Sequence, residues 1–140
     1  MKKNNIFPFD NGGVEKKLED IEYVAEGIGF IKSRKADSKI MDMAEKMIRY
    51  AAEGYRVAIS DVIVDGSATV DVDRMSIDHL VEEMERDDIA VVFVRNITDI
   101  TEDIPDLIKF MNIAKYNEVS IFDMSRGCKV SVEPPAEFGC

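Results

Sequence analysis

The sequence predicts an α/β domain with three layers, in which a mainly parallel sheet of four to five strands is flanked by helices. The run Ile89–Val94 is apolar throughout, which suits a strand buried on both faces. Short apolar runs alternate along the chain with segments of helical periodicity, and this alternation requires right-handed crossovers and a parallel sheet. A chain of 140 residues is long enough for one core.

Three regions follow from the pattern along the chain. Residues 1–26 are predicted to form a loose leader and then, over 14–26, a short amphipathic helix, because apolar residues recur there at helical spacing (Val14, Leu18, Ile21, Val24). Residues 27–133 are predicted to form the α/β domain. Residues 134–140 open with two prolines, so we expect a flexible tail.

Within the domain, each predicted element ends at turn or cap chemistry. We expect strands over 27–31, 55–64, 89–94 and 119–122, with a short edge strand over 129–132. We expect helices over 37–53, from Asp73 or Ser76 along an apolar face from Ile77 to Met84, and from near Glu102 or Pro105 to Ala114. Thr98 or Thr101 is the expected cap of the last helix. Gly54 is the expected left-handed residue after the first.

Three features of these elements allow two interpretations each. Gly27 and Gly29 could suggest a nucleotide-binding turn, but the third glycine of that motif is missing, so a strand that needs small residues is favoured. The single histidine, His79, could be catalytic or bind a metal, but no partner for either role is recognisable, so a solvent-facing side chain is favoured. Methionines 41, 43 and 47 could form a soft binding face, although core or half-buried packing is the favoured interpretation.

The composition excludes several classes of protein. A net charge of -10 and a pI near 4.6 oppose binding of this chain alone to DNA, because phosphate neutralisation needs clustered Lys and Arg. Cys128 and Cys140 have no partner at metal-ligand spacing, so free thiols and a cytoplasmic location are expected. No secretory signal and no membrane span is recognisable.

Polar or charged segments follow the ends of the first three predicted strands, where ligands collect in parallel α/β sheets. The first strand leads into Phe30-Ile31-Lys32-Ser33-Arg34. After the second strand, Asp65 and Arg74 lie nine residues apart. The central strand leads into Thr98-Asp99-Ile100-Thr101-Glu102.

From Ile28 to Asp123, these motifs and the order of elements resemble the catalytic domain of serine recombinases, the resolvase and invertase family. The resemblance implies a resolvase-like, flavodoxin-like arrangement and DNA strand exchange by a serine nucleophile. The first family motif is Tyr-x-Arg-x-Ser, in which Phe30 and Lys32 keep an aromatic and a cation but Arg34 replaces the nucleophile. Ser33 lies one residue early, and such a shift turns a side chain to the other face of a strand.

The other two motifs are preserved unequally. Asp65 and Arg74 keep the family spacing. In the family's Asp-Arg-Leu-x-Arg segment, by contrast, Asp99 and Glu102 replace the two arginines that hold the scissile phosphate. Phosphoryl transfer needs positive charge around the transferred group, so these two carboxylates are expected to repel a phosphodiester. The family's long dimerisation helix and DNA-binding domain are also not expected, because only 18 of the 140 residues follow Phe122.

Three functional hypotheses remain. The favoured one is a catalytically inactive resolvase-like domain without a cofactor, a protein-interaction or regulatory relic of a site-specific recombination system of a mobile element. It would act on a protein partner or as a homo-oligomer, and its enzymatic status stays open. The second is an active recombinase or nuclease that uses Ser33 with Lys32, Arg34 and Arg74. It requires that the first strand ends before Ser33. It also requires that Asp99 and Glu102 point away or bind a metal. The third is a ligand or divalent-metal module built from converging acids, although caps and helix-dipole partners explain such acids better; the candidates are Asp61, Asp65, Asp99, Glu102 and Asp123.

Overall fold

A computed structural model describes residues 23–33, 38–66, 74–133 and 137–139 of the chain. The elements alternate from the first strand to the fourth, as the periodicity predicts. In order they are β1 (Ala25–Lys32), α1 (Ser38–Gly54), β2 (Val57–Asp65), α2 (Met75–Met84), β3 (Ile89–Val94), the 3-10 turn η3 (Ile97–Asp99), α3 (Ile104–Tyr116), β4 (Ser120–Asp123), β5 (Cys128–Glu133) and β6 (Glu137–Gly139).

The strands form a mainly parallel sheet in the order β2-β1-β3-β4-β5-β6. The first four strands of the chain pair in parallel, β5 runs antiparallel to β4, and β6 runs antiparallel to β5. The predicted α/β class is therefore confirmed, and the expected edge strand over 129–132 is present as β5.

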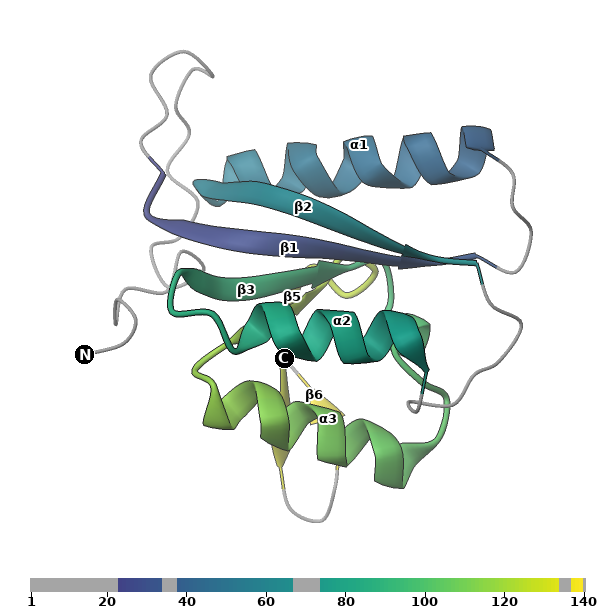
Figure 1. Ribbon diagram of the computed structural model, residues 1–140, viewed down its shortest axis with the longest axis vertical. Helices are drawn as coiled ribbons and strands as arrows, with labels where there is room; N and C mark the ends of the chain where they lie inside the picture. Colours follow the sequence, from purple (N-terminus) through teal and green to yellow (C-terminus); the bar gives the residue numbers. More distant parts are fainter. Residues whose placement is uncertain (1–22, 34–37, 67–73, 134–136, 140) are drawn as a thin grey trace.

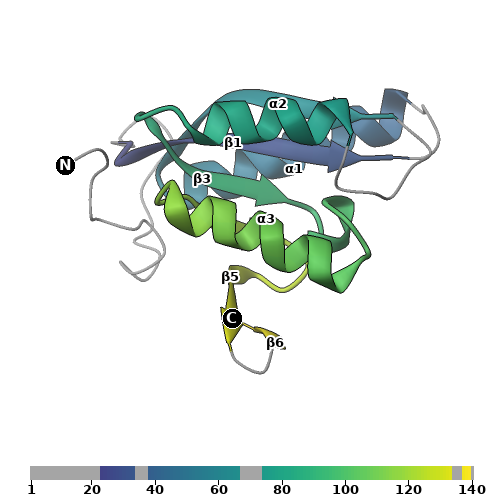
Figure 2. The same cartoon turned by 60° about the horizontal axis from the view of Figure 1, so that its bottom comes forward.

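Helices cover both faces of the sheet. Figure 1 shows α1 on one side of β1 and β2, with α2 and α3 on the other side, and Figure 2 shows α2 and α3 together on the face opposite α1. The core is divided accordingly: Val92 and Val94 pack toward α2 and α3, whereas Val91 and Phe93 pack toward α1. Because β3 supplies buried side chains to both cores, it reads as a continuous apolar run.

The two glycines of β1 allow this close packing. A Cβ atom added at Gly27 would lie 2.8 Å from the backbone oxygen of Val91, and one added at Gly29 would lie 2.9 Å from Ile48 Cγ2. The strand therefore needs small residues at both positions, as expected, because its neighbours leave no space for a side chain.

The structure corrects the predicted ends of the domain. Ala25 and Glu26 belong to β1, so the helix predicted over 14–26 cannot extend to residue 26; its part up to residue 22 lies outside the described residues. Residues 137–139 form β6 rather than a flexible tail, because they pair with β5. Cys128 is disulfide-bonded, so the free thiol predicted there is wrong, and Cys140 lies outside the described residues.

The cap predictions are wrong in their details. Asp103 caps α3, accepting a hydrogen bond from the Asp106 backbone at 3.0 Å, so neither threonine is the cap. Ser76 lies inside α2 and makes no hydrogen bond from Oγ, whereas Asp73 lies outside the described residues. The left-handed residue after α1 is Arg56 (φ 61°) and not Gly54.

Two side-chain predictions can also be compared with the structure. His79 is exposed, as expected, with Nε2 3.5 Å from a carboxylate oxygen of Glu83. The favoured packing interpretation of the α1 methionines is wrong for Met43 and Met47, which are exposed. None of the helices in the described part of the chain is both long and apolar enough to cross a membrane.

Candidate functional site

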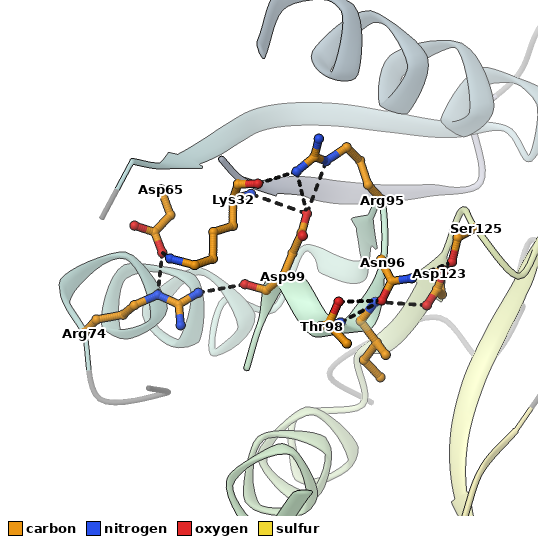
Figure 3. Close-up of polar contacts among 10 residues, drawn as sticks. Lys32, Asp65, Arg74, Arg95, Asn96, Thr98, Asp99, Asp123 and Ser125 are labelled. Atoms are coloured by element: carbon orange, nitrogen blue, oxygen red, sulfur yellow. Dashed lines mark hydrogen bonds and ion pairs between the residues drawn. The ribbon is translucent and has the colours of Figure 1, made fainter. Parts of the chain in front are cut away.

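The candidate site lies where the sheet reverses its direction of winding. The chain passes from β1 to β2 on one side and then to β3 on the other side of β1, and parallel α/β sheets bind ligands at such a point, beyond the carboxyl ends of the strands. Lys32 ends β1, Asp65 ends β2, and Arg95 follows β3. Figure 3 shows these side chains converging with Arg74 and Asp99.

Asp65 is held between two cations. Its Oδ2 accepts a hydrogen bond from Arg74 Nε and lies 3.6 Å from Lys32 Nζ. All three side chains are buried, and the Arg74 guanidinium lies 5.8 Å from the centre of the Phe30 ring. A buried charge is tolerated only with such partners, so this cluster fixes the ends of β1 and β2 to the start of α2.

The remaining donors of Arg74 hold the segment after β3. Nη1 donates to the backbone oxygen of Ile100 and Nη2 to that of Asp99, each at 2.7 Å. The guanidinium thus has three partners, one carboxylate and two consecutive backbone carbonyls. The nine-residue spacing recognised in the sequence corresponds to a link between β2, α2 and η3.

The Asp99 carboxylate points back toward the sheet. Its Oδ2 lies 3.2 Å from both Nε and Nη2 of Arg95 and accepts a 3.4 Å hydrogen bond from the Lys32 backbone. Arg95 also donates to the Lys32 backbone oxygen. Burial raises the pKa of Asp99, and Arg95 with the Lys32 backbone N–H offsets that effect only in part.

A second polar cluster lies beside the first, at the end of β4. The fully buried Asp123 accepts hydrogen bonds from Ile97 N at 2.9 Å, Ser125 Oγ at 2.6 Å and Arg126 N at 3.1 Å. Asn96 donates to Ser125 Oγ at 2.9 Å (Figure 3). This network joins the segments that follow β3 and β4, and Asp123 acts in it as a structural acceptor.

The structure brings together only some of the predicted site residues. β1 ends at Lys32, and the half-buried Ser33 follows with its backbone N–H donating to the Asp65 backbone oxygen at 3.0 Å. Arg34 lies outside the described residues. Glu102 is exposed, whereas Asp99 points into the cluster, so these two acids do not act as a pair.

The five acids proposed for a metal site do not converge as one set, because only Asp65 and Asp99 lie in the same cluster. Asp61 is exposed and accepts from the backbone N–H of Val62 at 2.8 Å, while Asp123 belongs to the separate network. Across the residues that the structure describes, no group of three or more His, Cys, Asp or Glu side chains is arranged to hold a metal ion. The placement of these acids thus contradicts the converging set on which the third hypothesis depended.

Arg95 is the site residue that the sequence interpretation missed. Its signal was available, because it directly follows the buried strand β3 and precedes Asp99 by four residues, a spacing at which side chains often meet. With it, the cluster contains the cations of Lys32, Arg74 and Arg95 and the anions of Asp65 and Asp99. Each of these cations contacts a carboxylate of the same chain.

Solved structures show where this fold occurs. The N-terminal catalytic domain of TP901-1 integrase matches with a TM-score of 0.67 at 12% identity, over 74% of this chain and 81% of that one. The C-terminal catalytic domain of ISC1926 TnpA, an IS607-like serine recombinase, matches with a TM-score of 0.64 at 12% identity, over 70% and 68%.

A resolvase family site-specific recombinase from Streptococcus pneumoniae matches with a TM-score of 0.65 at 12% identity, over 79% of each chain. Neither a protein-family model nor a curated protein matches the sequence. At 12% identity, these matches show a shared fold only. The shared fold agrees with the family resemblance of the sequence motifs. The chain has the fold of serine recombinase catalytic domains.

Proposed function

We propose that this chain is a catalytically silent recombinase-like domain, which acts through protein contact in a site-specific DNA recombination system. The observation that carries the proposal is the position of Asp99, whose carboxylate accepts hydrogen bonds from Arg95 and from the Lys32 backbone. In the family that this chain resembles, an arginine that holds the phosphate stands at this position. Here a guanidinium that would attract a phosphate is replaced by a carboxylate that competes with the phosphate for the nearby cations.

Charge supports the same conclusion. Lys32 and Arg74 share the carboxylate of Asp65, and Arg95 contacts that of Asp99. A phosphodiester would have to displace an internal carboxylate from a partly dry site, where interactions between charges are stronger than in water. Phosphoryl transfer depends on cations that are available to the transferred group, and this cluster directs them inward.

The position of the nucleophile also supports a silent domain. The family motif has its serine two residues after the cation, where this chain has Arg34, and an arginine cannot form the covalent ester with DNA. Contact with a protein partner is then the way in which such a domain would act, and a net charge of -10 agrees with a partner other than free DNA.

The test is covalent capture of DNA by the purified full chain. Supercoiled plasmid and short duplexes are incubated with the protein, with and without Mg²⁺, and then separated on denaturing gels. We expect no nicks and no protein linked to DNA. Cleavage or a covalent adduct that requires this protein would overturn the proposal.

The second candidate is an active DNA-cleaving domain with Ser33 as the nucleophile. One observation favours it: β1 ends at Lys32, so Ser33 is released from the strand alternation that would turn its side chain away. The position of Asp99 argues against this candidate, because an active site needs this carboxylate to point away and it points into the cluster. The Ser33→Ala variant decides between the two candidates, since only an active domain has a cleavage product that this change abolishes.

A further inference from the structure

The outer face of α1 carries an apolar stripe. Met43, Met47 and Tyr50 are 64%, 54% and 75% exposed, at spacings of four and three residues. A different face of the helix packs on the sheet through the buried side chains of Ala44, Ile48 and Ala52. A helix of an ordinary soluble domain buries one apolar face, so a second apolar stripe on the same helix indicates a contact surface.

The spacing of the stripe matches a short heptad seam. Met43 and Tyr50 are seven residues apart and occupy one core position of such a repeat, and Met47 occupies the other. Two helices that present this pattern pack side by side with interlocking side chains. Methionine suits such a contact because its flexible thioether adapts to the opposing surface.

Charges beside the stripe favour an antiparallel arrangement of two copies. Lys39, Lys46 and Glu53 recur every seven residues along one flank of the seam. In an antiparallel pair of identical helices, this flank meets its own copy in reverse, so Lys39 of each copy lies opposite Glu53 of the other. The two Lys46 side chains meet at the centre, so two pairs of opposite charge flank one pair of like charge. A parallel pair does not bring these opposite charges together.

The balance of charge on α1 also favours a second copy. The helix carries three basic residues (Lys39, Lys46, Arg49) and three acidic ones (Asp42, Glu45, Glu53), in a chain whose net charge is -10. Two copies that approach through α1 therefore meet at a neutral surface, where the repulsion between two acidic proteins is small.

We propose that α1 is a homodimer interface, in which the stripe of Met43, Met47 and Tyr50 packs antiparallel on the stripe of a second copy. The dimer is weak and depends on concentration, because one helix face per copy buries less than the ~1,600 Å² of a standard stable interface. This inference rests on the proposed function only in naming the contact through which the domain would act.

The test is sedimentation equilibrium of the full chain over a wide range of concentration. We expect a reversible dimer with a dissociation constant on the order of 10–100 μM. Met47→Asp places an unpaired charge in the seam and should raise that constant by roughly tenfold or more. Met75→Asp is the matched control, because Met75 is 87% exposed on α2, away from the stripe, and should leave the constant unchanged.

A charge exchange tests the antiparallel arrangement. Glu53→Lys should weaken the dimer, and adding Lys39→Glu to it should restore the wild-type dissociation constant. A wild-type chain that stays monomeric, an equal effect of both aspartates, or a double variant no better than Glu53→Lys would overturn the proposal. None of these outcomes predicts a change in the DNA capture assay. A cleaved duplex in that assay would overturn the proposed function but would not bear on the dimer interface.

Discussion

Arg74 and Asp65, nine residues apart in the sequence, form a buried ion pair in which the side chains are 5% and 4% exposed. The pair connects the end of β2 with the start of α2, and Arg74 extends it to the backbone of Asp99 and Ile100. Arg74 therefore links the end of β2, the start of α2 and the segment after β3. Removal of the ion pair should affect stability more than any surface change.

Asp65→Ala should destabilise the domain by about 3–5 kcal/mol, because it leaves the buried Lys32 and Arg74 without their carboxylate. Urea unfolding followed by circular dichroism measures the change. Glu45→Ala is the matched control, since it breaks an exposed pair with Arg49 and should cost at most about 1 kcal/mol. Equal losses in the two variants would contradict the structural role of Asp65.

Asp99→Asn should make the protein more stable at pH 7. Burial raises the pKa of Asp99, so the folded state binds this proton more tightly than the unfolded state, and ionisation at neutral pH costs folding free energy. The wild type should therefore lose stability as pH rises from the ordinary Asp pKa of 3.8 through the raised value.

The measurement for Asp99 is denaturant unfolding of wild type and variant across this pH range. The two curves should separate at neutral pH and converge below pH 3.8. Glu102→Gln is the matched control, because Glu102 is exposed and its replacement should change stability by no more than about 0.5 kcal/mol. A variant less stable than the wild type at pH 7 would refute the assigned direction.

Gly27→Ala should destabilise the sheet by about 1–3 kcal/mol, because its Cβ would lie 2.8 Å from the backbone oxygen of Val91, which cannot move aside. Gly54→Ala is the control, since nothing lies within 4 Å of a Cβ at that position. Thermal unfolding compares the two variants. If Gly27→Ala melts with the wild type, the close approach of β1 and β3 is not as described.

Asp103→Ala should cost about 1 kcal/mol, because its carboxylate accepts the backbone hydrogen bond that caps α3. Ser76→Ala should cost much less, since Ser76 Oγ has no hydrogen-bond partner. Chemical unfolding of both variants distinguishes these roles. Equal effects would mean that Asp103 does not act as the cap.

The order of helices and strands could be predicted because the spacing of apolar residues along the chain reflects which side chains each element buries. β3 is recognisable because it is buried on both faces, and the site could be placed because parallel strands end at one edge of the sheet. The spacing of Asp65 and Arg74 is recognisable as a family motif, but the ion pair between them is known only from the structure. The direction in which the Asp99 side chain points could not be predicted, because it also depends on the Lys32 backbone, which is 67 residues away in the sequence.

The errors have similar physical causes. Asp103, Thr101 and Thr98 are all able to cap a helix, and only the path of the chain after η3 decides which one does. Arg56 takes the left-handed conformation expected of a glycine because the turn into β2 falls two residues later than Gly54. The exposure of Met43 and Met47 depends on which face of α1 meets the sheet, and both of its faces are apolar.

The most direct test of a catalytically silent domain is whether a phosphodiester enters the cluster. A short DNA duplex is titrated at physiological salt into the isotope-labelled full chain, with NMR detection of the backbone amide of Lys32 and the Nε–H groups of Arg74 and Arg95. We expect that these resonances do not move, because Asp65 and Asp99 already accept hydrogen bonds from these donors. A saturable shift of all three would contradict it.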